Sequence, residues 1–280
     1  MFGLFLILAI GVALIIVVLA GPWRRARRRR RLAEGAFPAE WLQILRLHLP
    51  VFSRLPDDVR TATLDAMKVF LAEKRFVGCN GLVVDDTMRV IIAAQACLLV
   101  ARLGVHRYDS LRAILLYPHT FVAEHVHSDE AGVHTVEAKE LGGESWSDGK
   151  VVLSWQDVRE GLDAGDDAYN VVYHEFAHQL DQADGAGDGA PPLSGDGGYE
   201  RWAEVLQAAY DELLDDLERG RATLIPPEGA ENESEFFAVA TEVFMDRARA
   251  LRARHPALYA QLRGFYGLDP AAWHSADPSP

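Results

Sequence analysis

The segment from Asn170 to Asp181 constrains this chain most strongly, because it sets two histidines and a glutamate among apolar residues. Its sequence is NVVYHEFAHQLD. On an α-helix, residues four apart lie one turn apart on the same face, so His174 and His178 can direct their rings at one point. The apolar neighbours predict that this helix is buried. Buried polar side chains need partners, so the fold must bury this helix and also satisfy its histidines.

The residues His174, Glu175 and His178 form the motif HExxH, which predicts a zinc site. Zinc held by three protein ligands keeps one position for water and lowers the pKa of that water to about 7. Glu175 is then placed to take a proton as the water attacks a peptide carbonyl, and to pass it to the leaving amine. The alternative is a helix face that carries these residues by coincidence.

A third ligand must come from elsewhere in the chain. Asp181 follows His174 by seven residues, which is about 10 Å along a helix and too far for one shared ion. We expect Asp181 to be a carboxylate behind the ligands or a polar group at the helix end. Glu235 is the better candidate, because it lies on a predicted helix with an otherwise apolar face. The alternative for Glu235 is an N-terminal capping box with Asn232.

Glu242 follows Glu235 by seven residues and lies on the same face of the predicted helix. A carboxylate at this place is suited to orient a histidine ligand through its second ring nitrogen. The alternative is an ordinary solvated charge on the helix surface.

The N-terminus has a different character, because residues 1–20 contain no charged or polar side chain. Twenty helical residues span about 30 Å, the hydrocarbon thickness of a bilayer. Seven arginines follow between Arg24 and Arg31. A cleaved signal peptide carries its basic residues before the apolar stretch, and a buried core helix would not precede such a block. We therefore expect residues 1–21 to be a single-pass anchor in the inner membrane, with the rest of the chain in the cytoplasm.

The arginines belong to residues 22–36, which we expect to be a basic, flexible linker that fixes topology and contacts anionic lipid headgroups. Beyond Leu32 the chain has 21 lysines and arginines against 41 acidic residues, a net charge of −20. Such an acidic body repels nucleic acid, so we expect no direct nucleic-acid binding.

Cys79 and Cys97 lie in apolar stretches outside any CxxC pair, which favours buried free thiols in a reducing compartment.

The rest of the chain predicts one domain of class α+β, residues 37–274, followed by a disordered tail at 275–280. The pattern is mixed early and mainly helical late. Helices are expected at 38–48, 57–73, 88–103, 170–182, 199–219, 233–246 and 256–266, and strands at 112–117, 120–126 and 150–155. Asp148-Gly149 between two β-prone runs predicts a hairpin turn. We expect the strand that carries Val151 and Leu153 to be an edge that pairs with an extended peptide substrate, or else an ordinary strand.

Over most of residues 37–270 the chain resembles the Mlc titration factor A family of zinc peptidases. The resemblance rests on six stretches in the family's order: KRFVGCNGLVVDDTMRVIIAAQACLLVARL at 74–103, ILLYPHTF at 114–121, GESWSDGKVVLSW at 143–155, NVVYHEFAHQLD at 170–181, ENESEFFAVATEVF at 231–244 and LYAQLRGFYGLDP at 258–270. It implies a gluzincin-type site with His174, His178 and Glu235 as zinc ligands and Glu175 as base. It also implies aminopeptidase-like activity and, in enterobacterial members, binding to the glucose-responsive repressor Mlc.

Two features depart from that family. Its members often carry a tyrosine seven residues before the ligand glutamate, suited to stabilising an oxyanion, and this chain has Glu228 there. The best-known soluble members also lack the apolar N-terminus. Two functions therefore remain in view: a zinc metallopeptidase acting on a peptide or protein, and a regulatory protein of low activity that binds and sequesters a transcriptional regulator.

Overall fold

The computed structural model describes residues 20–128, 134–141, 143–146, 149–163, 169–193 and 198–273. Its α-helices, after a first one that covers residues 20–34, are α2 (Ala39–His48), α3 (Asp57–Glu73), α4 (Asp86–Leu99), α5 (Trp155–Asp163), α6 (Val171–Asp181), α7 (Gly198–Glu218), α8 (Glu233–Asp246), α9 (Ala248–Arg254) and α10 (Pro256–Tyr266). Short 3-10 helices include η1 (Pro50–Ser53), η2 (Val105–Tyr108), η4 (Gln182–Asp184), η5 (Pro227–Ala230) and η6 (Pro270–Ala272).

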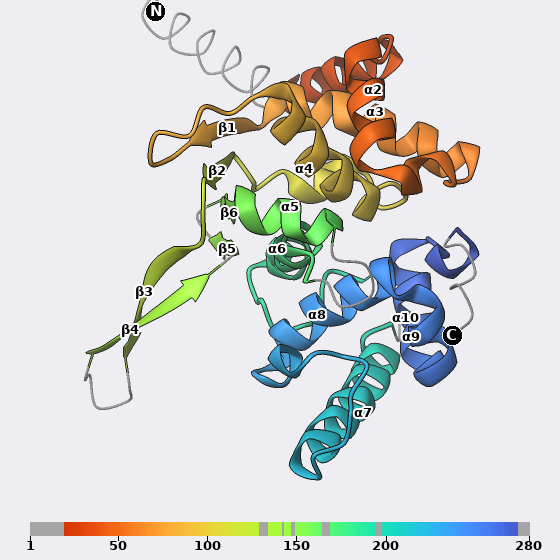
Figure 1. Ribbon diagram of the computed structural model, residues 1–280. Coiled ribbons are helices and arrows are strands. Elements are labelled where there is room, and N and C mark those ends of the chain that lie inside the picture. The colour runs from red at the N-terminus through yellow and green to blue at the C-terminus, as the bar shows by residue number, and fades with distance from the viewer. Residues whose placement is uncertain are drawn as a thin grey trace, which may run out of the picture.

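Two small sheets accompany the helices. The strands are β1 (Arg75–Gly78), β2 (Ala113–Tyr117), β3 (Phe121–Ser128), β4 (His134–Leu141), β5 (Gly143–Trp146) and β6 (Lys150–Ser154). The first sheet has the order β1-β2-β6-β5, with β1, β2 and β6 parallel and β5 antiparallel to β6. The antiparallel pair β3 and β4 forms an arm that projects from the body (Figure 1). The predicted α+β class is confirmed.

Helix α6 occupies the middle of the body and is buried at every residue. Figure 1 shows α2, α3 and α4 gathered at one end and α7, α9 and α10 at the other, with α6 between them. Phe176 of α6 packs its ring against Phe70 and Tyr108, with centroids 5.8 and 5.2 Å apart. Complete burial of one such side chain stabilises the fold by about 1.5–3 kcal/mol. The apolar residues between the histidines therefore fix α6 in the core.

The predicted elements agree with the structure within a few residues along most of the chain. Local signals explain this agreement: Asn170 caps α6 by accepting a hydrogen bond from the Tyr173 backbone N–H, and Asp85 caps α4 in the same way. The predicted hairpin is also confirmed, because β5 pairs with β6 and Gly149 has φ +86°, a conformation that favours glycine. Asp148 lies outside the described residues.

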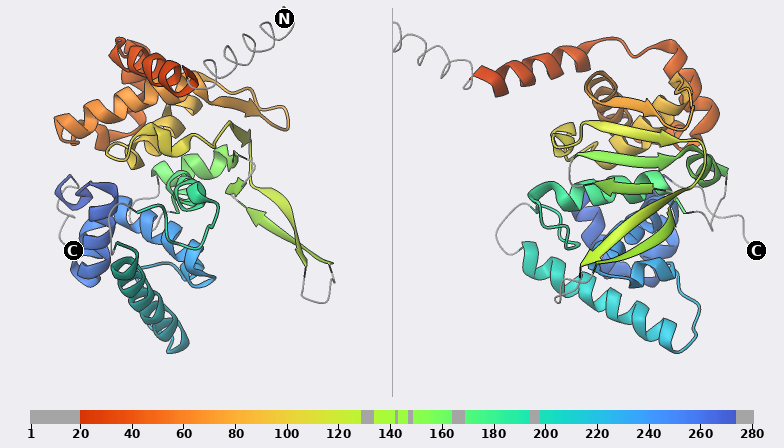
Figure 2. Two further views of the ribbon diagram at one scale, coloured as in Figure 1. Left: turned by 180° about the vertical axis from the view of Figure 1, so that it is seen from behind. Right: turned by 90° about the vertical axis from the view of Figure 1, so that its left-hand side faces the viewer.

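The expectation of a flexible linker at residues 22–36 is wrong. Residues 20–34 are helical, and Arg29 forms ion pairs with Glu73 and Asp109, at 2.6 Å each. The partners of Arg29 lie 44 and 80 residues further along the chain, so the local sequence does not show them. Figure 2 shows this helix, in red, at the outer edge of the body.

The predicted membrane anchor, residues 1–21, lies almost wholly outside the described residues. Within the part of the chain that the structure describes, no helix combines the length and the apolar character needed to span a bilayer. The expected disordered tail at 275–280 also lies outside the described residues.

Candidate metal centre

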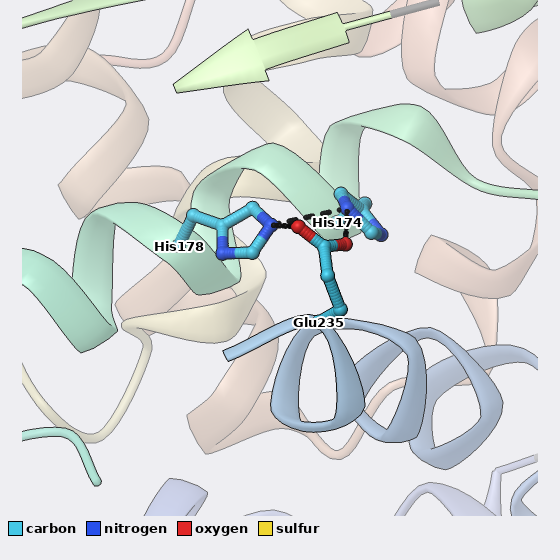
Figure 3. Close-up of side chains that lie close together, drawn as sticks. All are labelled: His174, His178 and Glu235. Atoms are coloured by element: carbon cyan, nitrogen blue, oxygen red, sulfur yellow. Dashed lines mark hydrogen bonds and ion pairs between the residues drawn. The ribbon is translucent and has the colours of Figure 1, made fainter. Parts of the chain in front are cut away.

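His174 and His178 extend from one face of α6 toward the start of α8 (Figure 3). The two ring Nε2 atoms are 3.1 Å apart, and the ring centroids are 4.7 Å apart. Only 6% of His174 and 7% of His178 are exposed. The spacing of four residues thus brings both histidines to one point, as the helical periodicity predicts.

Glu235 reaches the same point from the first turn of α8. Its carboxylate oxygens lie 3.2 Å from His174 Nε2 and 3.3 Å from His178 Nε2. The Asn232 side chain caps α8 by accepting a hydrogen bond from the Glu235 backbone N–H. Of the alternative capping box, the hydrogen bond to the Asn232 side chain is therefore present. The Glu235 side chain does not complete the box, because its carboxylate lies against the histidines. Among the described residues, these three side chains are the group whose ligand atoms could share one ion.

The second nitrogen of His174 faces a buried carboxylate. His174 Nδ1 lies 2.7 Å from Glu242 Oε1, and Glu242 Oε2 accepts a hydrogen bond from the Asn170 backbone N–H at 2.8 Å. Asn170 is held in turn by its side-chain N–H, which donates to Gln95 Oε1 at 2.9 Å. Glu242 is only 5% exposed, which excludes the alternative of a solvated surface charge.

The second ring nitrogen of His178 contacts a hydroxyl group, whereas that of His174 contacts a carboxylate. His178 Nδ1 lies 3.2 Å from Ser234 Oγ, and Ser234 Oγ donates a hydrogen bond to Asp181 Oδ2 at 2.8 Å. The Gly189 backbone N–H also donates to Asp181 Oδ2. Asp181 therefore acts on His178 through Ser234, a residue that the sequence analysis missed. The sequence offers one indication of this role: Ser234 directly precedes the candidate ligand Glu235.

These contacts set the charge of the site. Burial lowers the pKa of His174, but hydrogen bonds to Glu235 and Glu242 outweigh it and raise this pKa well above its ordinary value. Burial raises the pKa of Glu235, yet the hydrogen bonds to His174 and His178 bring it well below the usual range. Burial raises the pKa of Glu242. A raised pKa at His174 means that acid favours a proton there in competition with a metal.

The donor set fits zinc. When Nδ1 of each histidine donates to its oxygen partner, both Nε2 lone pairs face Glu235. Ligand atoms at 2.0–2.1 Å from a tetrahedral zinc lie about 3.4 Å from one another. The observed separations of 3.1 to 3.3 Å agree with this value.

Glu175 lies beside this cluster and is only 3% exposed. The edge strand β5 approaches it so closely that a Cβ atom on Gly143 would lie 2.6 Å from Glu175 Cγ and Oε1. Ser145 of the same strand accepts a hydrogen bond from the Gln179 side chain of α6 at 2.6 Å. Gly143 is therefore required for β5 and α6 to approach closely, which the sequence analysis did not foresee.

The prediction that Val151 and Leu153 lie on an edge strand is wrong. Both residues are in β6, which lies between β2 and β5, and both are completely buried. The strand at the edge nearest α6 is β5. Strand order depends on contacts between distant segments, which a local pattern does not contain.

Tyr169 is a further residue at the site that the sequence analysis missed. Its ring centroid lies 5.3 Å from that of His174, and 43% of the residue is exposed. Desolvation by the surrounding protein, and then the negative charge of Glu175, raise the pKa of Tyr169 well above its ordinary value. The phenol therefore stays protonated near neutral pH. Glu228 is exposed in η5.

Comparison with known proteins identifies the family of this chain. The model of the family described as glucose-regulated metallo-peptidase M90 matches residues 23–267. This chain therefore belongs to that family of metallopeptidases, and the predicted membership of the Mlc titration factor A family is confirmed.

Individual relatives cover most of the chain. An uncharacterized protein of Synechocystis sp. is 39% identical over 244 residues, which is 87% of this chain and 89% of that protein. Mlc titration factor A of Cronobacter sakazakii is 30% identical, covering 89% of this chain and 91% of that protein. Mlc titration factor A of Yersinia pestis is also 30% identical, with 84% and 86% covered.

Proposed function

We propose that this protein is a zinc-dependent metallopeptidase of the gluzincin type, in which His174, His178 and Glu235 hold the metal. One observation carries the proposal: the three ligand groups lie 3.1 to 3.3 Å from one another. Both Nδ1 atoms have partners of their own, so the two Nε2 atoms are directed at the shared point. Bound zinc would supply a Lewis acid that polarises a peptide carbonyl and acidifies a water molecule.

Glu175 is the proposed general base. Its carboxylate takes a proton from the attacking water and then donates that proton to the amine nitrogen as the C–N bond breaks. The products are a carboxylic acid and a free amine. Packing of Glu175 against Gly143 supports this assignment, because it limits the positions open to the carboxylate.

Tyr169 is the proposed donor to the carbonyl oxygen as negative charge develops on it. This assignment rests on its ring contact with His174 and on its protonated phenol. A hydrogen-bond donor placed at such an oxygen stabilises the transition state. Tyr169 would then do the work that the family's tyrosine does at the position occupied here by Glu228.

The substrate is proposed to bind as an extended peptide along β5, because β5 is the edge strand that contacts α6. The aminopeptidase-like preference implied by the family resemblance is part of the proposal. So is the single-pass anchor of residues 1–21 in the inner membrane, which would leave the peptidase domain in the cytoplasm.

A regulatory function is the second candidate. Relatives are named Mlc titration factor A, and Glu228 stands where the family's tyrosine is expected. These observations favour a protein of low activity that sequesters a transcriptional regulator. A pull-down with Glu175→Gln separates the two functions: a partner that this variant and the unsubstituted chain both hold uncleaved supports sequestration, whereas a partner held by the variant alone supports a peptidase substrate.

The test of the main proposal uses the full chain in an uncharged detergent. We expect about one zinc ion per chain by mass spectrometry of the metal, and hydrolysis of short peptides. Glu175→Gln should keep the zinc and lose on the order of 10²–10⁴-fold in activity. Peptides with free and blocked N-termini, run side by side, test the aminopeptidase preference. Equal activity in the variant and the unsubstituted chain would overturn the proposal.

A further inference from the structure

The helix of residues 20–34 places five of its seven arginines in two opposite sets. Arg25 and Arg29 face the domain: Arg25 lies 3.1 Å from Asp109, and Arg29 forms two ion pairs of 2.6 Å with Glu73 and Asp109. Only 14% of the Arg29 side chain is exposed. Ion pairs thus fix one face of this helix on the body.

The end of the same helix has a second attachment. The Lys68 ammonium donates hydrogen bonds to the backbone oxygens of Ala33 and of Gly35. A cation at the last carbonyls of a helix is favourable, because these oxygens carry partial negative charge. Two points of contact make the helix a fixed part of the domain.

The opposite face carries Arg24, Arg27 and Arg31, which are exposed. At about 100° per residue these three positions fall within roughly 60° of one another. No ion pair joins any of the three to another residue in the described ranges, and Arg27 lies over the ring of Trp23 at 5.4 Å. The positive charge of this face is therefore unneutralised, although the body beyond it carries a net charge of −20.

Trp23 is 63% exposed on this face. Together with the three arginines, Arg28 and Leu32, it lines an open hollow of about 450 Å³. Arginine forks match phosphate oxygens, and tryptophan is enriched at the level of lipid headgroups. An apolar run of twenty residues directly precedes this helix in the sequence, which favours a bilayer over other polyanions.

We propose that Trp23, Arg24, Arg27 and Arg31 form a binding surface for the phosphates of anionic phospholipids in a bilayer. Arg25 and Arg29 are the contacts that hold this surface on the domain. The domain would then lie on the membrane in one orientation, because the lipid-binding helix is fixed to it at Glu73, Asp109 and Lys68. The inference does not depend on the proposed peptidase activity.

The test uses the full chain in an uncharged detergent, with bound lipid counted by native mass spectrometry. Phosphatidylglycerol is expected to bind about tenfold or more tightly than phosphatidylcholine, and this preference should weaken with added salt. The triple variant Arg24→Gln, Arg27→Gln, Arg31→Gln should bind both lipids equally. The matched control Arg46→Gln, Arg54→Gln, Arg252→Gln removes the same charge from exposed sites and should keep the preference.

Three results would overturn the proposal. The unsubstituted chain could bind the two lipids equally, or its preference could persist at high salt. The two triple variants could also lose the preference to the same extent. Inorganic phosphate and a short DNA duplex are tested as competitors. Tighter binding of phosphate would point to a free anion as the occupant, and tighter binding of the duplex to a nucleic acid.

Discussion

Helix α6 and the helix of residues 20–34 both carry groups that can be charged, but different forces hold them. Every residue of α6 is buried, and its histidines have partners at 2.7 to 3.3 Å. The N-terminal helix lies at the outer edge (Figure 2) and is held by ion pairs that range from exposed, at Arg25, to largely buried, at Arg29. Buried polar groups are costly when they lose a partner, whereas surface ion pairs contribute at most about 1 kcal/mol. The same substitution should therefore act strongly in one region and weakly in the other.

The largest effect on zinc binding is expected from Glu242→Gln, which replaces the carboxylate behind His174. The amide should orient the ring less well and lower its basicity, so that zinc affinity falls about 10–100-fold. Competition with a chromophoric chelator measures this affinity. Glu212→Gln, at an exposed carboxylate of α7, is the control. Unchanged zinc affinity in Glu242→Gln would show that Glu242 does not support the ligand.

Tyr169→Phe tests the proposed oxyanion donor. It should lower kcat about 10–100-fold, with little change in KM or in bound zinc, because the hydroxyl acts when charge develops on the carbonyl oxygen. Tyr199→Phe, at another exposed tyrosine, should leave kcat unchanged. A rise in KM with constant kcat would assign Tyr169 to substrate binding instead.

Asp246→Asn tests the cost of a half-buried charge near the end of α8. Burial raises the pKa of Asp246 to about 7, and its Oδ2 is buried with no hydrogen-bond partner in the described part of the chain. Since the folded pKa lies above the unfolded one, the folded state binds the proton more tightly and loses stability as pH rises through 4 to 7.

The amide removes this cost. The free energy of unfolding in urea should rise by about 1–2 kcal/mol at pH 8 and by less at pH 5. Asp211→Asn, at an exposed position of α7, should change it by less than about 0.5 kcal/mol at both pH values. A gain for Asp246→Asn that is larger at pH 5 than at pH 8 would contradict the sign of this prediction.

The smallest effect is expected from Arg29→Gln in the N-terminal helix. Loss of its ion pairs should lower the free energy of unfolding by about 1 kcal/mol, because Asp109 is 42% exposed and Arg28 remains 4.0 Å from Glu73. Trypsin should nonetheless cleave the arginine segment faster, and added salt should speed cleavage of the unsubstituted chain. Arg30→Gln, whose partner Glu34 lies on the same helix, is the control. Equal cleavage of the two variants would show that Arg29 does not hold the helix.

Local chemistry made much of the fold predictable. The predicted bounds 57–73 and 233–246 match α3 and α8, because acidic first-turn residues and the Asn232 cap mark where these helices begin. Strand β1 was missed, because four residues without clear alternation become a strand only by pairing with β2, far along the chain. The partners of Arg29 were hidden for the same reason.

The candidate site shows the same limit. The helical period brings His174 and His178 together, and a carboxylate on an apolar helix face pointed to Glu235. Ser234 and Tyr169 acquire their places only when α6, α8 and the loop before α6 meet. A single sequence does not predict these contacts, because they depend on how distant elements pack.

The contact of Gly143 with Glu175 bears on the conformational entropy of the proposed base. A glutamate on a surface helix moves among several rotamers, and holding one of them costs up to about 2 kcal/mol. Here the backbone of β5 fills the space that some of these rotamers would need. The carboxylate therefore loses its freedom once, when the chain folds, and does not lose it again in each catalytic cycle.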